Sequence, residues 1–473
     1  MIVKMYIVFM TIYLRSVSWR PDLPADGDEP LHAQLVRALA RDLATGALSP
    51  GDRLPTHRRL AEDLAIGVGT VTRAYAEAER RGLVTSTVGR GTFIAEAAGG
   101  AAPPASGMID LAHNIAPTAP AARRIRALVA RLARRHDLAD QIAYAPAAGF
   151  EAHRRAAAGW LAKTSGLVSA DWTRLLITGG AQQAMSLVFG CLCRPGDTIL
   201  TETATFFGMR SLAEHAGLRL RGAPMDAEGL TPEGLDEAAR ISGARVLYVL
   251  PTLQNPTGRT MGRARREAII EIARARDLWI VEDDVYGAFA EAAPAPLAEL
   301  APERTFYISG VSKVIGPGLR TGYLVAPDAD RFDRLVQAMR AVCYAPPALG
   351  ALAAAQWMED GEADAILAEV RDETRARHVL ASSILGPHAE RQSPVGPHIW
   401  LPLPEAEAER FAGLALRADV EVTPPSAPIV EPGAISGVRL CLGAAAGQDD
   451  LRRALTVLKG ILEGGVGRTS GTV

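Results

Sequence analysis

Cysteine, lysine and net charge are all scarce in this chain of 473 residues. The four cysteines show no paired metal-ligand spacing, which argues against a metal site and a disulfide framework. A formal net charge of −2 excludes a chain that coats nucleic acid through overall basicity, so any DNA contact must come from a local patch. We therefore expect reduced thiols, no metal and a cytoplasmic location.

Apolar runs long enough to span a membrane are also missing. Residues 1–14 are apolar apart from Lys4, but they are too short to cross a bilayer, and no small-residue cleavage site follows them. We interpret residues 1–29 as an N-terminal extension, with Met10 as an alternative start, and expect no membrane partner.

Primary amines are rare, because only four of the 51 basic residues are lysines. A chain that uses arginine for nearly all of its positive charge has few amines, so a lysine in a motif-rich segment is a candidate for chemistry. This argument singles out Lys313.

Composition divides the chain at residues 96–107, which are mostly small and rich in Ala, Gly and Pro, as in a linker. We expect one domain over residues 30–95, a second over residues 108–465, and a short tail over residues 466–473. The length of the chain also favours more than one domain.

The first domain has the pattern of three helices and a hairpin. Leucines recur every four residues from Leu31 to Leu43, Thr56 can cap a short second helix, and a third helix is expected over residues 70–81. Two strands are expected around a glycine turn at residues 89–91. This layout is that of a winged helix-turn-helix, with a small helical interaction domain as the alternative. Nine arginines against six acids in residues 31–95 favour contact with phosphate.

The segments LPTHRRLAEDL, TVTRAY and GRGTF resemble the GntR-type DNA-binding domain. The resemblance implies that double-stranded DNA is a partner and that four side chains approach it: Arg58, Thr70, Arg73 and Arg90. Gly67-Val68-Gly69 stands where such domains usually carry polar residues at the start of the recognition helix, which leaves fewer side chains to read bases.

The second domain alternates short apolar strands with helices, as in an α/β domain with a mostly parallel sheet. The strands are expected in LLITGG, DTILTE, RVLYVLP, LWIVEDD and FYISG. Ligands in such sheets lie beyond the carboxyl ends of the strands. Thr178 to Gln182 can hold a phosphate at a helix start, Asn255 can donate to a ligand oxygen, and Asp283 and Lys313 supply an acid and an amine. Each position taken singly also fits an ordinary turn or cap.

Three segments, YVLPTLQNPTG, VEDDVYGAF and SGVSKVIGPGLRTGYL, resemble the fold-type I aminotransferases. The resemblance implies an α/β fold-type I domain that uses pyridoxal 5'-phosphate. It makes Lys313 the lysine of the internal aldimine and Asp283 the partner of the ring nitrogen, these two being the catalytic pair. It assigns further roles: Asn255 and Tyr286 at the phenolic oxygen; Ala181, Gln182, Ser312 and Arg320 at the phosphate; Phe206 stacked on the ring; Tyr144 at the phosphate of a partner subunit in a homodimer; and Arg439 at a substrate carboxylate. Gly310 departs from the family, which commonly has Ser or Thr there.

A GntR-type domain ahead of an aminotransferase-like domain resembles the MocR-type transcriptional regulators. The resemblance implies a regulator that senses an amino compound, or pyridoxal phosphate itself, at Lys313. A working aminotransferase acting on an amino acid is the alternative, because the catalytic set is complete. A cofactor reservoir is the third hypothesis.

Overall fold

The computed structural model describes residues 19–21, 30–44, 48, 52–80, 83–87, 91–94, 107–433 and 435–464. The chain divides into two compact units, Met1–Ser106 and Gly107–Val473. Residues 1–14, most of the linker and Arg90 lie outside the described residues. What the sequence predicts for them therefore stays a prediction.

The first unit contains the three helices and the hairpin that the sequence predicts. The helices are α1 Leu31–Ala44, α2 His57–Leu64 and α3 Val68–Arg80, and the antiparallel strands are β1 Val84–Thr87 and β2 Gly91–Ile94. The Thr56 hydroxyl caps α2 by accepting from the Arg59 amide at 3.3 Å, as predicted. The third helix starts two residues earlier than expected. One apolar core joins these elements, with Leu39, Leu60 and Val71 at most 1% exposed.

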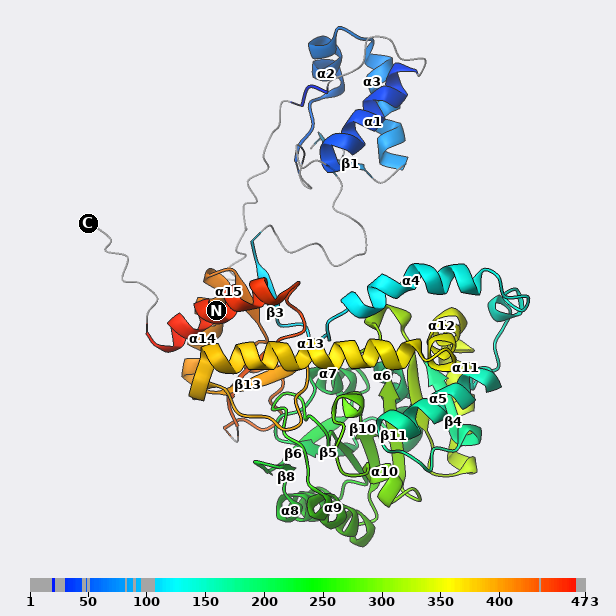
Figure 1. The fold of residues 1–473 in the computed structure, drawn as a ribbon, viewed down its shortest axis with the longest axis vertical. Helices are drawn as coiled ribbons and strands as arrows, with labels where there is room; N and C mark the ends of the chain where they lie inside the picture. Colours follow the sequence, from blue (N-terminus) through cyan, green and yellow to red (C-terminus); the bar gives the residue numbers. More distant parts are fainter. Residues whose placement is uncertain are drawn as a thin grey trace, which may run out of the picture. The chain divides into compact units, whose positions relative to one another are not determined.

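A seven-stranded sheet forms the centre of the second unit (Figure 1). Its order is β4-β12-β11-β10-β9-β5-β6. All of the predicted strands are present, and the sheet is mostly parallel, with β12 antiparallel to both of its neighbours. The bounds are β4 Leu175–Thr178, β5 Thr198–Glu202, β6 Arg219–Ala223, β9 Val246–Val249, β10 Trp279–Asp283, β11 Thr305–Gly310 and β12 Gly322–Val325. The sequence reasoning did not identify β6 or β12.

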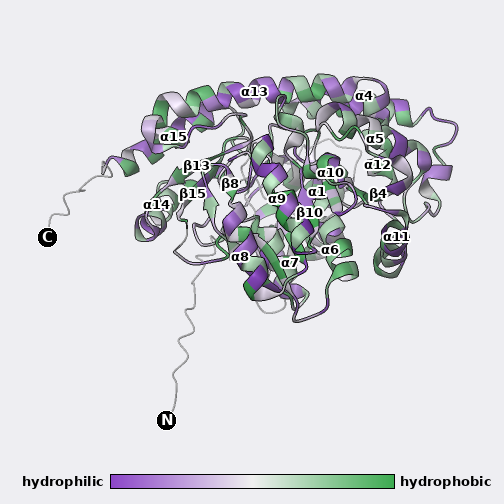
Figure 2. Ribbon diagram, turned by 90° about the horizontal axis from the view of Figure 1, so that it is seen from below, coloured by the Kyte–Doolittle hydropathy of each residue, from purple (hydrophilic) through white to green (hydrophobic). Residues whose placement is uncertain are grey.

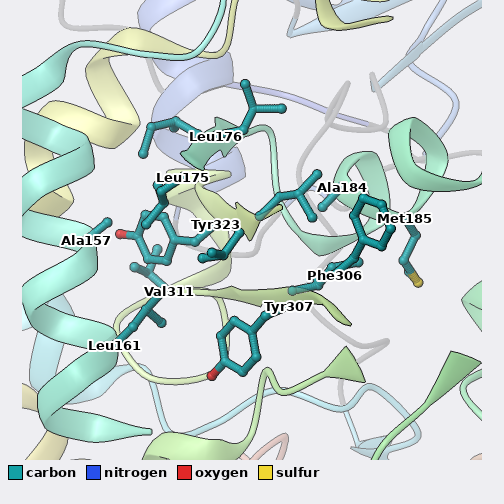
Figure 3. Close-up of a cluster of buried hydrophobic side chains, with 14 of the residues drawn as sticks. Ala157, Leu161, Leu175, Leu176, Ala184, Met185, Phe306, Tyr307, Val311 and Tyr323 are labelled. Carbon is teal, nitrogen blue, oxygen red and sulfur yellow. The ribbon is translucent and has the colours of Figure 1, made fainter. Parts of the chain in front are cut away.

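The core of the second unit forms where helices pack on this sheet. Figure 3 shows Tyr323 of β12 beside Leu175 of β4 and Ala157 of helix α5, and these residues belong to the largest buried apolar cluster. Every residue of β4, β9 and β12 is buried, which explains why β4 and β9 are apolar runs in the sequence. The helices of this part are α4 Ala119–Leu132, α5 Glu151–Thr164, α6 Ala181–Leu192, α7 Phe207–His215, α8 Pro232–Ser242, α9 Arg263–Ala275, α10 Leu297–Leu300, α11 Ala329–Cys343 and α12 Ala348–Glu359.

A second apolar core lies in the C-terminal part. The long helix α13 Glu362–Leu385, drawn in yellow in Figure 1, runs from this part toward α12, and Figure 2 shows hydrophilic and hydrophobic stretches alternating along it. The short strand β3 Ile109–Leu111 pairs in parallel with β14 Val420–Val422. The other elements are β7 Met225–Asp226, β8 Gly229–Leu230, β13 His398–Pro402, β15 Gly437–Cys441, α14 Glu405–Arg417 and α15 Gln448–Leu462.

Two further features concern the helices and the cysteines. Over the described residues, no helix has both the length and the apolar character needed to cross a membrane. All four cysteines are free thiols: Cys441 is buried, Cys191 and Cys193 are half-buried, and Cys343 is exposed.

Candidate functional site

One cavity lies at the carboxyl ends of the central strands and at the start of α6. Asp283 ends β10, Gly310 ends β11, Asn255 follows β9, and Ala181 begins α6. The location agrees with the rule that α/β sheets bind ligands beyond their carboxyl ends. The residues lining the cavity are Ala181, Gln182, Phe206, Leu250, Asn255, Asp283, Val285, Tyr286, Gly310, Ser312, Lys313 and Arg320.

The amine in this cavity belongs to Lys313, three residues beyond the end of β11. Its Nζ donates a hydrogen bond to the carbonyl oxygen of Asn114. Burial lowers the pKa of Lys313 from 10.5 to about 8, and the positive charges of Arg439 and Arg320 add to this effect. A lowered pKa makes the neutral, nucleophilic amine accessible near physiological pH.

The acid facing the cavity is Asp283, which is 2% exposed. Its Oδ2 accepts a 2.7 Å hydrogen bond from the Tyr248 hydroxyl, while Oδ1 is buried and has no hydrogen-bond partner among the described residues. Burial raises the pKa of Asp283. An unpaired buried carboxylate oxygen is costly, so this atom is suited to a ligand that brings a donor.

The neighbouring acids Glu282 and Asp284 make different contacts. Glu282 accepts hydrogen bonds from the amides of Leu297 and Ala298 at the start of α10. Asp284 accepts from the Tyr307 hydroxyl at 2.6 Å, and burial raises the pKa of Asp284, with a further contribution from the charge of Glu282. Because side chains alternate along a strand, only the middle acid of the three lines the cavity.

A polar network joins the cavity to the C-terminal part. The Tyr286 hydroxyl accepts from Asn114 Nδ2 at 2.8 Å and from Asn255 Nδ2 at 3.5 Å. Asn255 Oδ1 in turn accepts from Arg439 Nη1 at 2.6 Å. Arg439 is 2% exposed, so the structure places it behind Asn255 and not on the cavity wall.

The opposite end of the cavity is suited to an anion. The first amides of α6, at Ala181 and Gln182, have no carbonyl within the helix to bond, and the helix dipole favours negative charge there. Arg320 reaches the same place, where its Nη2 donates to the Gly179 carbonyl at 2.9 Å. Gly180 has φ +109°, a backbone conformation that favours glycine, and a Cβ there would lie 2.8 Å from Arg320 Nη2.

An aromatic ring forms another wall. Phe206 lines the cavity beside α7, and a Cβ at Gly208 would lie 2.4 Å from the Phe206 ring. Gly208 therefore allows the ring to lie against the helix backbone. Gln182 Nε2 donates to the Gly208 carbonyl at 2.8 Å and so holds the first turn of α7 in place.

Gly310 departs from the family resemblance for a steric reason. A Cβ at this position would lie 2.9 Å from the Thr321 carbonyl oxygen and 3.2 Å from the Gly322 Cα of the adjacent strand β12. A serine or threonine could not be accommodated without moving β12. The hydroxyl of the neighbouring Ser309 donates a hydrogen bond to the Asp284 carbonyl, so it is already used in a contact with the main chain.

Most of the residues that the sequence singles out come together at this cavity. Two of the residues that the resemblance assigns to this site do not line it: Arg439, described above, and Tyr144, which is 86% exposed and whose ring is tilted by 58° against that of Tyr344, with the ring centroids 4.9 Å apart. The residues brought together are Lys313, Asp283, Asn255, Tyr286, Ala181, Gln182, Phe206, Ser312 and Arg320.

Sequence reasoning missed three polar residues around the cavity: Tyr248, Asn114 and His398. His398 is fully buried, and its Nδ1 lies 3.1 Å from Asn114 Nδ2 while its Nε2 lies 3.2 Å from the Gln254 carbonyl. Since an amide nitrogen donates, Nδ1 accepts and Nε2 carries the proton, and burial lowers the pKa of His398 to about 3. No motif marks these residues, although Tyr248 begins the YVLP segment that precedes Asn255.

The first unit has its own candidate surface on α2 and α3. The side chains of Arg58 and Arg73 are exposed and Thr70 is half-buried. The two helices are held by the Tyr75 hydroxyl, which donates to the Pro55 carbonyl at 3.0 Å, and by an edge contact between the Tyr75 and His57 rings. Gly67, Val68 and Gly69 are exposed at the start of α3, where they offer little besides backbone and one apolar side chain.

Family models match both units. Residues 31–94 match the bacterial regulatory proteins of the gntR family, and residues 106–458 match aminotransferase class I and II. The first match identifies a DNA-binding helix-turn-helix domain.

Three curated relatives span most of the chain. It is 25% identical to the HTH-type transcriptional regulator YdeF of Bacillus subtilis, over 94% of this chain and 97% of the relative. It is 27% identical to the pyridoxine biosynthesis regulator PdxR of Corynebacterium glutamicum, over 75% and 78%. It is 28% identical to the probable rhizopine catabolism regulatory protein MocR of Rhizobium meliloti, over 66% and 69%.

Among solved structures, the chain is similar to LysN, the alpha-aminoadipate aminotransferase of Thermus thermophilus, in complex with N-(5'-phosphopyridoxyl)-L-leucine. The TM-score is 0.67 at 25% identity, over 76% of this chain and 93% of LysN. The likeness confirms the fold-type I architecture of the second unit.

Proposed function

The chain belongs to the aminotransferase class I and II family and carries a GntR-type domain, as MocR-type regulators do, and from this premise we propose that it is an effector-sensing transcriptional regulator. The effector is an amino compound or pyridoxal phosphate itself, sensed through the amine of Lys313. The relative PdxR, whose name links it to pyridoxine biosynthesis, supports the second of these effectors. Such a protein acts in the cytoplasm, where its DNA is.

The cofactor of this family is pyridoxal 5'-phosphate, and the cavity fits it. When bound, it supplies an aldehyde that reacts with amines and a ring that accepts electrons. Asp283 Oδ1, buried and without a partner among the described residues, suits a ring N–H, and the α6 N-terminus with Arg320 and Ser312 suits a phosphate. Asn255 and Tyr286 would bind the ring oxygen, and Phe206 would lie against the ring.

The observation that carries the proposal is the unpaired Oδ1 of Asp283 in the same cavity as the Lys313 amine, whose pKa is lowered. A buried carboxylate oxygen without a partner costs stability unless a ligand supplies a donor to it. The chain therefore retains the chemistry of cofactor binding in a protein whose other unit binds DNA.

Two finer elements complete the proposal. Arg439 would bind the carboxylate of an effector, since guanidinium and carboxylate form paired hydrogen bonds. Tyr144, exposed on its own subunit, would reach the cofactor phosphate of a second copy, which makes the regulator a homodimer. Arg58, Thr70, Arg73 and Arg90 would contact the operator.

A catalytic aminotransferase is the second candidate. It is favoured by the completeness of the lining set around Lys313 and by the likeness to LysN, an aminotransferase. In that case the second unit would catalyse transamination of an amino acid, and the first unit would not bind DNA with sequence selectivity.

Footprinting on DNA upstream of the chain's own and neighbouring genes distinguishes the two candidates. The wild type and Lys313→Ala would be compared with and without pyridoxal phosphate. A discrete protected site that changes with the cofactor, and no longer does so in Lys313→Ala, supports the regulator. No protection under any condition, together with steady keto-acid production from an amino acid, supports the enzyme.

A further inference from the structure

The hydroxyl proton of Tyr286 has no acceptor among the described residues. Tyr286 is 2% exposed and lines the cavity, and its oxygen has two hydrogen-bond partners there: Nδ2 of Asn114 at 2.8 Å and Nδ2 of Asn255 at 3.5 Å. An amide nitrogen donates and does not accept. The Tyr286 oxygen therefore accepts from both neighbours, and its own proton is left for a group in the cavity.

The orientation of the Asn255 amide is fixed by Arg439. Arg439 Nη1 lies 2.6 Å from Asn255 Oδ1, and a guanidinium has donors only and keeps its charge in proteins. The oxygen of this amide must therefore face Arg439, which leaves its nitrogen toward Tyr286. A cation thus determines, through one amide, that this neighbour of the Tyr286 hydroxyl is a donor.

The orientation of the Asn114 amide is fixed by His398, the first residue of β13. His398 Nε2 lies 3.2 Å from the Gln254 carbonyl oxygen, which only accepts, so Nε2 carries the proton. Burial lowers the pKa of His398 to about 3, so the ring is neutral and Nδ1 is an acceptor. The Asn114 nitrogen, 3.1 Å away, supplies the donor that Nδ1 needs. The opposite orientation of the amide would set two acceptors against each other.

The Asn114 amide is held by its two N–H groups and not by its oxygen. One N–H group faces His398 and the other faces Tyr286. Asn114 Oδ1 is buried and has no hydrogen-bond partner in the part of the chain that the structure describes. An unpaired buried acceptor costs stability, so the donors determine which way this amide points.

The turn at residues 112–115 holds the main chain of Asn114 in place. Its Ala112 carbonyl accepts from three side chains: Arg439 Nη2 at 2.9 Å, Thr423 Oγ1 at 3.1 Å and Cys441 Sγ at 3.3 Å. Asp110 Oδ1 accepts from the amides of Ala112 at 2.7 Å and His113 at 3.0 Å. The backbone that carries the Asn114 side chain is therefore fixed from both sides.

We propose that His398 and Asn114 are positioning residues that direct the Tyr286 proton into the cavity, and that the site thereby selects a ligand with an accepting ring oxygen. The inference rests on the proposed function, because it takes the ring oxygen of pyridoxal phosphate as the group opposite Tyr286. A hydroxyl already turned toward the cavity needs no rearrangement when such a ligand arrives. It stays unpaired with a ligand that lacks the oxygen, and an oxygen with negative charge makes the strongest bond.

Two probes that bind without a covalent bond measure this selection. They are pyridoxamine 5'-phosphate and 3-deoxypyridoxamine 5'-phosphate, which carries hydrogen in place of the ring hydroxyl. In calorimetric titrations of the cofactor-free full-length protein, we expect the wild type to bind the first at least about tenfold more tightly. Equal affinities overturn the inference and leave the cofactor site standing. Failure of both probes to bind overturns the cofactor site and the inference with it.

Asn114→Asp tests the direction of the proton, because a carboxylate accepts where the amide donates. This variant should lower the preference for pyridoxamine 5'-phosphate over the deoxy probe by about tenfold or more. The same substitution is then made in a Tyr286→Phe background, where only repulsion between the new carboxylate and the ring oxygen remains. We expect a clearly smaller loss of preference there, as in a double-mutant cycle of two coupled residues. Equal losses in the two backgrounds overturn the inference without touching cofactor binding.

Two substitutions of His398 test the other end of the network. His398→Leu removes the acceptor that orients the Asn114 amide, while His398→Asn can place an oxygen where Nδ1 lies. His398→Leu should lower the preference between the two probes several-fold, and His398→Asn should stay within about twofold of the wild type. Equal losses in both variants, or no loss in His398→Leu, contradict the inference. Thermal unfolding of each variant confirms that it is folded.

Discussion

The hydroxyl of Tyr248 donates a 2.7 Å hydrogen bond to Asp283 Oδ2 and leaves Oδ1 of the same carboxylate facing the cavity unpaired within the described part of the chain. Tyr248 lies on β9 and Asp283 on β10, which are adjacent parallel strands. Tyr248 therefore orients the acid without lining the cavity itself. It is a positioning residue for the ring-nitrogen partner.

Replacing this tyrosine tests that role. Tyr248→Phe should lower the free energy of unfolding by about 1–3 kcal/mol, because a buried carboxylate oxygen loses its donor. It should also weaken the binding of pyridoxal phosphate, measured by fluorescence titration. Tyr307→Phe is the matched control, since that hydroxyl serves Asp284 away from the cavity. Loss of stability without loss of affinity in Tyr248→Phe would reduce its role to packing.

The neighbouring acids Asp283 and Asp284 should respond differently to the same substitution. Asp283→Asn should weaken pyridoxal phosphate binding by about tenfold or more, because a charge-assisted hydrogen bond to the ring is lost. Burial and the charge of Glu282 raise the pKa of Asp284, and its Oδ2 accepts from Tyr307 instead of facing the cavity. Asp284→Asn should therefore bind the cofactor within about twofold of the wild type. Titration of both variants at pH 7 measures the contrast, and equal losses would contradict the assignment of Asp283.

The pKa of Lys313 predicts the pH dependence of cofactor incorporation. Only the neutral amine attacks an aldehyde, and the pKa is about 8, below the ordinary value of 10.5. The neutral fraction, and with it the rate of chromophore formation, should rise about tenfold between pH 7 and pH 9 and then level off. Lys313→Ala should form no borohydride-reducible chromophore. Lys163→Ala is the control, since Lys163 is exposed and pairs with Asp364. A rate still rising steeply at pH 10 would mean that the amine is not perturbed.

Gly310 should resist replacement by the residue type common in the family. Gly310→Ser should lower the free energy of unfolding by about 1–3 kcal/mol, because its Cβ would lie 2.9 Å from the Thr321 carbonyl. Gly318→Ala, with no atom within 4 Å of the added Cβ, is the comparison. Urea unfolding of the two variants measures the difference, and a Gly310→Ser protein as stable as the wild type would show that β12 can move.

The DNA contact predicted for Arg73 on α3 can be distinguished from a general effect of positive charge on DNA binding. Arg73 is exposed and forms no ion pair within the described residues, whereas Arg59 on α2 pairs with Asp63 at 3.1 Å. Arg73→Ala should weaken operator binding by about tenfold, and its salt dependence should become shallower by about one unit if the contact is to phosphate. Arg59→Ala should have a smaller effect. Gel-shift titrations over a series of salt concentrations measure both, and equal losses would argue against a specific role for Arg73.

The parts of this fold that could be predicted share a local signal. Strands β4, β5, β9, β10 and β11 are apolar runs because both faces of the sheet are covered, and Asp283 and Lys313 lie where such runs end. β6 was missed because it contains Arg219 and Arg221, and β12 because its residues form part of the motif that follows Lys313.

The missed site residues are those that tertiary structure brings in from elsewhere. Asn114 lies 172 residues before Tyr286 and 284 residues before His398, yet it contacts both. His398 lies on a buried strand of the C-terminal part, and the sequence around it does not distinguish it from an ordinary core residue. Arg439 was identified by resemblance, but its enclosure by Ala112, Asn255 and Thr423 could not be read from its neighbours in the sequence.

The Ala112 contact also determines how this site tolerates mutation. The atom that bonds Arg439 is a main-chain carbonyl, and every amino acid supplies one. Side-chain replacement at position 112 therefore leaves the acceptor in place, so substitutions at this position are expected to keep the contact. A proline at position 113 is different, because it removes the amide that Asp110 holds and restricts the backbone of residue 112. A saturation library over residues 112 and 113 would thus show tolerance at the first position and selection against proline at the second.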